Sequence, residues 1–361
     1  MKMKAHGRIL ALFCVVMLVV ASLAACGGNN NTASTPPPAT TPEPEAPVTV
    51  TLKLTHHQNP GTSGDAVINE WTKQVEDASN GTVKIEVYGA QTLGKQADFY
   101  DMVINGTADI GYCFIPNFPG QFPVSEGVAL PEMGLTSALQ ASQVLEGFYE
   151  TSELMQAEYK DVHPLFFHSH DPAPIGTVSK KVTSAGDIKG LNLRVIGDGQ
   201  IKMVQALGGG TVAIASTELY TSLEKGVIDG YAIGWEGIMA FKLPEVAKYI
   251  FDCNLYCGGF MMIMSNTSWN SLPPEAQAAF DAVSGMKAAE LFGNTWDEMV
   301  KKSRAEAEAT VEVTEISAEE QAKWGEIAGP IHEEWAANLR AKGIDGDLAY
   351  QQIQELVKKY A

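Results

Sequence analysis

After residue 48, apolar and polar residues follow two alternating patterns. Short apolar runs that favour strands lie at 48–54, 83–88 and 110–114. They are separated by segments at 65–78 and 96–104, in which apolar residues recur every three or four positions, as they do in helices. Strands that alternate with helices are typical of a mainly parallel sheet covered by helices. The pattern therefore predicts an α/β fold.

The same alternation continues from 187 to 233, where the strongest candidate residue lies. In a predicted strand over 191–195 the apolar residues share one face, which places Arg194 on the other. The elements predicted to follow are a helix over 201–207 ended by three glycines, a strand over 211–215, a helix over 217–225 with Ser216 as its N-cap, and a strand over 227–233. We expect this segment to hold a small anion.

The last third of the chain is predicted to be mainly helical. A further apolar strand at 258–266 is followed by a long Ala-rich amphipathic helix over 274–308 and by helices over 318–342 and 348–360. About 310 residues follow Pro47, which is enough for two domains with substantial cores.

The N-terminal 25 residues are typical of a lipoprotein signal peptide. Three basic residues precede an apolar run of about 15 residues, which is short for a membrane-spanning helix. Small residues then precede Cys26, which we expect to be lipidated after cleavage. Residues 26–47, rich in Asn, Thr, Pro and Glu, are predicted to be a disordered tether. A retained membrane anchor is the less favoured alternative.

The net charge excludes some partners. It is −18, and loss of the three basic residues in the signal peptide would leave −21. Nucleic acid and anionic lipid headgroups are therefore poor partners. A pocket for an anion must supply its own positive charge, because the surface is acidic.

Three cysteines remain in the folded part: Cys113, Cys253 and Cys257. A bridge between Cys253 and Cys257 is conceivable outside the cytoplasm, but an extended segment would hold their α-carbons too far apart. Unbridged, partly buried thiols are the favoured prediction.

Several short sequence words occur in one order along residues 50–340. They are found at 80–87, 93–94, 106–110, 120–123, 130–131, 187–195, 245–249 and 269–273. In this order they resemble the substrate-binding subunits of tripartite ATP-independent periplasmic (TRAP) transporters, the DctP-like family of carriers for organic acids. None of the words is specific alone; their order carries the resemblance.

The resemblance implies a two-domain periplasmic-binding-protein clamshell with mixed, mainly parallel sheets, a long domain-spanning helix and C-terminal helices. Domain I would combine 48–170 with about 258–290, domain II would combine 171–257 with part of 291–345, and 346–361 would be a C-terminal helix. The implied function is extracytoplasmic capture of an organic acid. Hinge closure would then deliver the acid to the small and large TRAP membrane subunits.

Arg194 is the leading binding candidate. A guanidinium presents a planar fork of donors that matches a carboxylate and stays charged. Arg194 also stands where the family has the arginine that clamps the ligand carboxylate, so the resemblance implies that role for it. The alternative is a surface salt bridge.

Trp235 is the second candidate, on a different argument. Many relatives have an Asn that donates to the ligand where this chain has Ile233. The loss of that amide and the nearby aromatic face of Trp235 favour an aromatic or branched 2-oxo or 2-hydroxy acid over a sugar acid. Core packing between the domains is the alternative role for Trp235.

The remaining candidates come mainly from the ends of strands, where open sheets bind ligands. The full set of predicted ligand-binding residues is Arg194, Trp235, His57, Gln91, Phe114, Asn117, Phe167, His168 and Tyr231. For Phe167 core packing is at least as well supported as a pocket role.

An enzyme is not expected, because no nucleophile, acid–base pair or cofactor loop has supporting spacing. No cofactor or metal is predicted. The alternatives kept open are a secreted metal-dependent hydrolase using His168, His170 and Asp171, and a binding subunit of an ATP-driven importer.

Overall fold

The computed structural model of the chain describes residues 49–361. They belong to one compact unit. The predicted signal peptide, Cys26 and the predicted tether lie outside the described residues. Within 49–361 no helix combines the length and apolar character needed to span a membrane.

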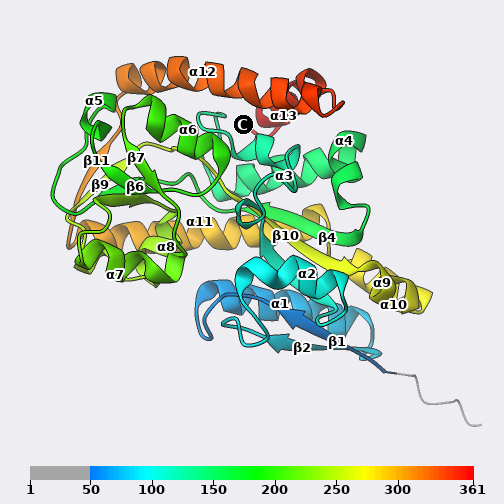
Figure 1. The fold of residues 1–361 in the computed structure, drawn as a ribbon. Helices are drawn as coiled ribbons and strands as arrows, with labels where there is room; N and C mark the ends of the chain where they lie inside the picture. Colours follow the sequence, from blue (N-terminus) through cyan, green and yellow to red (C-terminus); the bar gives the residue numbers. More distant parts are fainter. Residues whose placement is uncertain (1–48) are drawn as a thin grey trace, which may run out of the picture. The chain divides into compact units, whose positions relative to one another are not determined.

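The first sheet has five strands in the order β2-β1-β3-β10-β4 (Figure 1). Its strands are β1 (Val50–Thr55), β2 (Val83–Tyr88), β3 (Ile110–Phe114), β4 (Val162–Ser169) and β10 (Gly259–Ser265). β1 is parallel to β2 and β3, whereas β10 is antiparallel to β3 and β4. Because β10 is antiparallel to β3, its first residues lie at the edge of the sheet where β1 and β3 end.

The second sheet has six strands in the order β11-β9-β5-β8-β6-β7. Its strands are β5 (Ile175–Thr177), β6 (Asn192–Arg194), β7 (Gly210–Val212), β8 (Gly230–Ala232), β9 (Tyr249–Asp252) and β11 (Glu312–Glu315). β6 is parallel to β7 and β8, and β5 is antiparallel to β8 and β9. The predicted α/β class with mixed sheets is confirmed.

Two extended segments connect the sheets and are hydrogen-bonded to each other. They follow β4 and β9, and the N–H groups of His170 and Ala173 donate to the carbonyl oxygens of Gly258 and Tyr256 at 3.1 and 2.8 Å. Cys253 and Cys257 lie in the second segment and are unbridged and buried, as is Cys113. The domain boundaries inferred from the resemblance stay a prediction.

Helices cover the sheets and connect their strands. Their bounds are α1 (Ser63–Ala78), α2 (Phe99–Ile104), α3 (Ala138–Thr151), α4 (Glu153–Gln156), α5 (Ala185–Ile188), α6 (Asp198–Ala206), α7 (Leu219–Glu224), α8 (Trp235–Ala240), α9 (Asn266–Ser271), α10 (Pro274–Asp281), α11 (Met286–Glu308), α12 (Ala318–Ala341) and α13 (Gly346–Lys359). The two C-terminal helices agree with the prediction to within two residues. Helix α12 packs on α6, and α13 packs on α3.

The single helix predicted over 274–308 is wrong in one respect, because the structure divides it into α10 and α11. Gly285 has φ +58°, which interrupts the helix, and its N–H donates to the carbonyl oxygen of Leu165 at 2.9 Å. The second part, α11, packs on α3 and β4 and also on α8 (Figure 1). It therefore contacts elements that accompany both sheets.

Helix α3 buries a carboxyl group against the first sheet. Glu146 is 2% exposed, and its Oε2 accepts a hydrogen bond from the N–H of Phe167 on β4 at 2.6 Å. Burial raises the pKa of Glu146 to about 8. The folded state therefore binds the proton of this group more tightly than the unfolded state does.

This shift predicts a dependence of stability on pH. The stabilisation from protonated Glu146 is fully present below the ordinary pKa of 4.5 and is lost as the pH rises through about 8. Glu146→Gln keeps an acceptor for Phe167 but cannot ionise, so it should reduce the loss of stability between pH 6.5 and 8.5. Denaturant unfolding at both pH values measures this. An equal loss in variant and parent would contradict the burial argument.

Candidate ligand-binding site

A cavity of about 530 Å³ lies at the ends of strands from both sheets. The segments that follow β1, β3, β6 and β8 all contribute to its wall, together with the connecting segments and α11. The residues that line it include His57, Gln58, Asn59, Thr62, Gln91, Lys95, Gln96, Phe114, Asn117, His170, Asp171, Arg194, Ser216, Glu218, Glu236, Phe241, Tyr256, Phe260 and Trp296. Open α/β sheets place ligands at such strand ends.

Arg194 ends β6 and contributes a buried positive charge to this cavity. The residue is 2% exposed, and burial lowers its pKa. Its Nε donates to the carbonyl oxygen of Ile214 at 3.1 Å, and its Nη2 donates to Ser216 Oγ at 2.9 Å. No carboxylate among the described residues forms an ion pair with it. The remaining Nη hydrogens are therefore available to an anion in the cavity.

Ser216 has a different role from the one predicted. It begins a 3₁₀ turn over Ser216–Glu218 whose N-cap is Ala215, and the cap makes no side-chain hydrogen bond. The Ser216 hydroxyl instead accepts from Arg194. It thus orients the guanidinium rather than starting the helix.

An aspartate next to each of two parallel strand pairs holds the strand ends in register. Asp229 precedes β8, and its Oδ2 accepts from the N–H of Asn192 on β6 at 2.8 Å. Asp109 precedes β3, and its Oδ2 accepts from the N–H of Lys53 on β1, also at 2.8 Å. An aspartate–backbone hydrogen bond therefore fixes the register of β6, which ends in Arg194, and of β1, which leads to His57.

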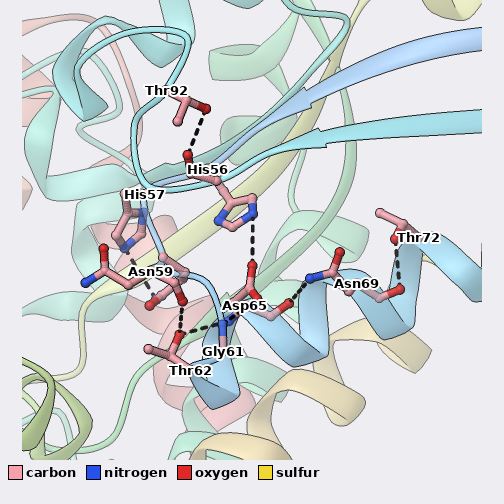
Figure 2. A network of polar contacts seen from close by, with 11 residues as sticks. His56, His57, Asn59, Gly61, Thr62, Asp65, Asn69, Thr72 and Thr92 are labelled. Atoms are coloured by element: carbon pink, nitrogen blue, oxygen red, sulfur yellow. Dashed lines mark hydrogen bonds and ion pairs between the residues drawn. The ribbon is translucent and has the colours of Figure 1, made fainter.

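The loop between β1 and α1 supplies polar wall and is fixed by a network around Asp65 (Figure 2). Asp65 Oδ2 accepts from the N–H of Gly61 at 3.0 Å, and its Oδ1 lies 3.6 Å from Nε2 of the buried His56. Thr62 Oγ1 donates to the carbonyl oxygen of Asn59 at 2.8 Å and caps α1. Burial lowers the pKa of His56 to about 4, so this ring is neutral near pH 7.

An aromatic stack forms another part of the wall. Phe260, at the start of β10, lies parallel to His57 and Tyr112, with ring centroids 6.0 and 5.1 Å away. Phe114 lies 4.7 Å and Trp296 6.1 Å from the same ring. Burial lowers the pKa of His57 to about 3, so its ring is an uncharged member of this wall.

Two carboxyl groups face the same cavity. Asp171 is 2% exposed, and its Oδ2 accepts from the N–H of Trp235 at 2.8 Å. Glu236, the next residue along the chain from Trp235, also lines the cavity. Burial raises the pKa of each of these carboxyls to about 7. Near pH 7 each carboxyl group is therefore partly protonated and partly ionised.

The family model for bacterial extracellular solute-binding protein, family 7 (DctP), matches residues 55–338. The chain belongs to this family. The C4-dicarboxylate-binding periplasmic protein DctP of Rhodobacter capsulatus is 24% identical over 298 residues, which cover 82% of this chain and 89% of that protein. The resemblance to TRAP solute-binding subunits is therefore confirmed.

Solved structures of TRAP solute-binding proteins are similar across most of the chain. One from a marine metagenome, specific for aromatic acid ligands and bound to 3-hydroxybenzoate, is 29% identical with a TM-score of 0.82 and covers 87% of this chain and 99% of its own. Another, from Rhodoferax ferrireducens T118 with copurified benzoate, is 28% identical with a TM-score of 0.81 and covers 86% of this chain and 98% of its own. The two-domain solute-binding fold is confirmed by these neighbours.

The structure brings five of the nine predicted ligand-binding residues of this DctP-family chain to the cavity. They are Arg194, His57, Gln91, Phe114 and Asn117. The alternative of a surface salt bridge for Arg194 is inconsistent with its burial. Their contact with a ligand stays a proposal.

The other four predicted residues have their side chains in the core. Trp235 and Tyr231 are buried in a cluster beside the second sheet, with the guanidinium carbon of Arg304 5.6 Å from the Trp235 ring centroid. Phe167 is buried in the largest core cluster. His168 is buried, with its Nε2 2.6 Å from the hydroxyl of Tyr112. Trp235 thus takes the packing role that was its alternative, and only its backbone N–H serves the site.

Several lining residues were not predicted, and only some left a signal in the sequence. Phe260 begins an apolar strand, but its place at the cavity depends on the antiparallel direction of β10. Glu236 lies just beyond the Ile233 position that was compared with relatives. Tyr256 and Trp296 reach the cavity from a connecting segment and from the middle of α11, which periodicity does not reveal.

The histidines weighed as metal ligands have other partners. His170 Nε2 accepts from the N–H of Gly258 at 2.9 Å, so its Nδ1 carries the proton and donates to the carbonyl oxygen of Asp171. No group of three or more His, Cys, Asp or Glu side chains in the described part of the chain is placed to hold a metal ion.

The positions of Trp235 and Phe260 predict a separation of stability from binding. Trp235→Phe should lower the free energy of unfolding by about 1–2 kcal/mol, because it removes buried packing, and should leave ligand affinity nearly unchanged. Phe260→Leu should weaken ligand binding, because it removes an aromatic ring from the cavity wall. Urea unfolding and titration calorimetry measure the two quantities. A several-fold loss of affinity in Trp235→Phe at unchanged stability would contradict this assignment.

Proposed function

We propose that this family 7 chain captures an aromatic monocarboxylate outside the cytoplasm and delivers it unchanged to the membrane subunits of a TRAP-type carrier. The observation that carries the proposal is the buried Arg194 guanidinium without a carboxylate partner among the described residues, beside an aromatic wall. An uncompensated buried charge is costly, and an anionic ligand supplies the missing partner.

The size and chemistry of the cavity favour an acid with a flat apolar body. The volume of about 530 Å³ is within the range of small-molecule sites. Phe114, Phe260 and Trp296 offer ring faces close together. Burial of about 100 Å² of ligand ring surface against them would contribute about 2.5 kcal/mol at about 25 cal/mol per Å².

The similar structures support the aromatic class. The proteins with bound 3-hydroxybenzoate and copurified benzoate cover most of this chain at 28–29% identity. Anchoring of the protein through lipid at Cys26 belongs to the same proposal, and it rests on the sequence pattern of the first 26 residues. A tethered subunit of this kind remains at the membrane while it searches for its carrier.

The proposal predicts which compounds stabilise the purified protein. Benzoate, 3-hydroxybenzoate and mandelate should raise the unfolding midpoint more than succinate, 3-methyl-2-oxobutanoate or glucuronate at the same concentration. A ligand at 100 times its Kd adds about 2.7 kcal/mol to the free energy of unfolding, which a thermal-shift assay detects easily. Larger shifts with the sugar acid or the dicarboxylate would overturn the aromatic assignment.

A substitution at Arg194 tests the anion site directly. Arg194→Met should weaken binding of the best acid by at least about 30-fold, because loss of a buried charged pair costs about 2–5 kcal/mol. The midpoint of the ligand-free protein should change little, because loss of the hydrogen bonds to Ile214 and Ser216 is offset by removal of a buried charge that has no ionic partner among residues 49–361. Arg340→Met, at an exposed arginine in α12, is the matched control and should bind normally. A variant that binds as tightly as the parent would exclude Arg194 as the anion site.

A further inference from the structure

Glu236 is a carboxyl group without a partner in a cavity that is proposed to receive a carboxylate. It is the second residue of α8, and its side chain lines the cavity together with Arg194. No hydrogen bond or ion pair joins it to another described side chain. A second carboxylate at this place would repel an acidic ligand if it were ionised.

Asp171 is a second cavity carboxyl group that would repel an acidic ligand if it were ionised. Its Oδ2 is held by the N–H of Trp235, but its buried Oδ1 has no hydrogen-bond partner within the described residues. Gly234 allows this close approach, because a Cβ at that position would lie 2.7 Å from Asp171 Oδ1. The Asp171 carboxylate is therefore fixed by a backbone hydrogen bond, whereas the Glu236 carboxylate is not held by any hydrogen bond within the described residues.

The charges of the half-buried and buried lining residues do not balance around a bound anion. Arg194 contributes one positive charge, while ionised Asp171, ionised Glu236 and the ligand would contribute three negative charges. Two further charged residues line the cavity, Lys95 and Glu218, but both are exposed and their opposite charges cancel. Concentrating excess negative charge in a buried site is costly, and protonation of carboxyl groups relieves it.

We propose that Glu236 is a specificity-determining residue that binds the ligand in its protonated form. It donates a hydrogen bond to a second oxygen of the acid, such as a ring hydroxyl or a 2-hydroxyl, so each anion enters together with one proton wherever Glu236 is ionised in the free protein. The proton comes from solvent and stays on the Glu236 carboxyl, and no bond of the ligand changes. This inference rests on the proposed function of the cavity and adds the ligand's second polar group to it.

The charged and titratable groups around Glu236 are compatible with this role. On α11, Arg304 is engaged by Asp252, Glu308 and Glu315. Glu236 acts on two neighbouring groups: its charge helps to raise the pKa of Asp171, as that of Asp297 on α11 does, and it helps to raise the pKa of the buried Tyr112 hydroxyl. Burial is the cause that raises the pKa of Glu236 to about 7.

Other cavity groups do not titrate in the range that matters. Burial lowers the pKa of His57 to about 3 and that of His170 to about 4, so both are neutral above pH 6. Burial raises the pKa of Tyr256 to about 12. Benzoic acids ionise near pH 4, as other carboxylic acids do, so the ligand stays an anion. A change in affinity between pH 6 and 8.5 would therefore report the two cavity carboxyls.

Titration calorimetry with 3-hydroxybenzoate at pH 6.0, 7.5 and 8.5 tests the inference. If only the protonated form binds, Kd should rise by about tenfold per pH unit above 7.5. Measurements in buffers of different ionisation enthalpy should show uptake of about one proton per ligand at pH 8.5. Glu236→Gln mimics the protonated carboxyl, so it should bind within about threefold of the parent at pH 6.0 and keep that affinity at pH 8.5.

Matched variants separate Glu236 from its neighbours. Glu224→Gln, at an exposed position on α7, should keep the parent pH profile. If the profile persists in Glu236→Gln, or disappears only in Asp171→Asn, the assignment to Glu236 is overturned. An equal loss of affinity at every pH in Glu236→Gln would also overturn it, because an ionised Glu236 would then be accepting from a ligand donor. Tight binding with no pH dependence refutes this inference alone, whereas no binding at any pH overturns the proposed function as well.

Discussion

The site depends on one constraint: a guanidinium is held inside the protein without a carboxylate partner among the described residues. Arg194 is fixed by the carbonyl oxygen of Ile214 and the hydroxyl of Ser216, which use part of its donor set and neutralise none of its charge. These neutral partners hold the planar group in place and leave Nη hydrogens for a ligand. In the proposed function, the absence of a fixed anion at this point is what allows the ligand carboxylate to bind.

Both sheets contribute to that arrangement by the same means. Asp109 and Asp229 each accept from the backbone of the neighbouring parallel strand, so β1 and β6 end at set positions. The two connecting segments then bond to each other through His170, Gly258 and their neighbours. His170 is neutral: its Nε2 accepts from Gly258 on the other segment, and its Nδ1 donates to the carbonyl oxygen of Asp171 on its own, so the ring joins the segments beside the cavity.

The cavity combines three kinds of surface with different effects on a ligand. In the proposed function, the guanidinium selects for negative charge, and the stacked rings around Phe260 select for a flat apolar body. In the further inference, Asp171 and Glu236 add a condition on protonation, because burial raises the pKa of both to about 7. An acid that satisfies all three must present its carboxylate, ring and second polar group in one fixed order.

The family and the class of fold could be predicted before any coordinates, because they rest on local patterns. Strand and helix periodicity predicted β1, β2, β3 and the C-terminal helices nearly to the residue. The ordered sequence words indicated the family, which the family model confirms. The place of Arg194 on the face opposite the apolar one also follows from two-residue alternation, whereas its place as the last residue of β6 does not, because the strand was predicted to run to 195.

Tertiary structure decided which aromatic and acidic side chains face the cavity. Alternation cannot tell a buried ring in the core from one at a cavity, so Trp235 and Phe260 were not distinguishable. The antiparallel direction of β10 and the packing of α11 on α8 bring together residues more than 100 positions apart, such as Phe114 and Phe260. Local sequence determined the strands and their ends, and long-range packing determined the composition of the site, because burial and pKa depend on neighbours that the chain brings together only on folding.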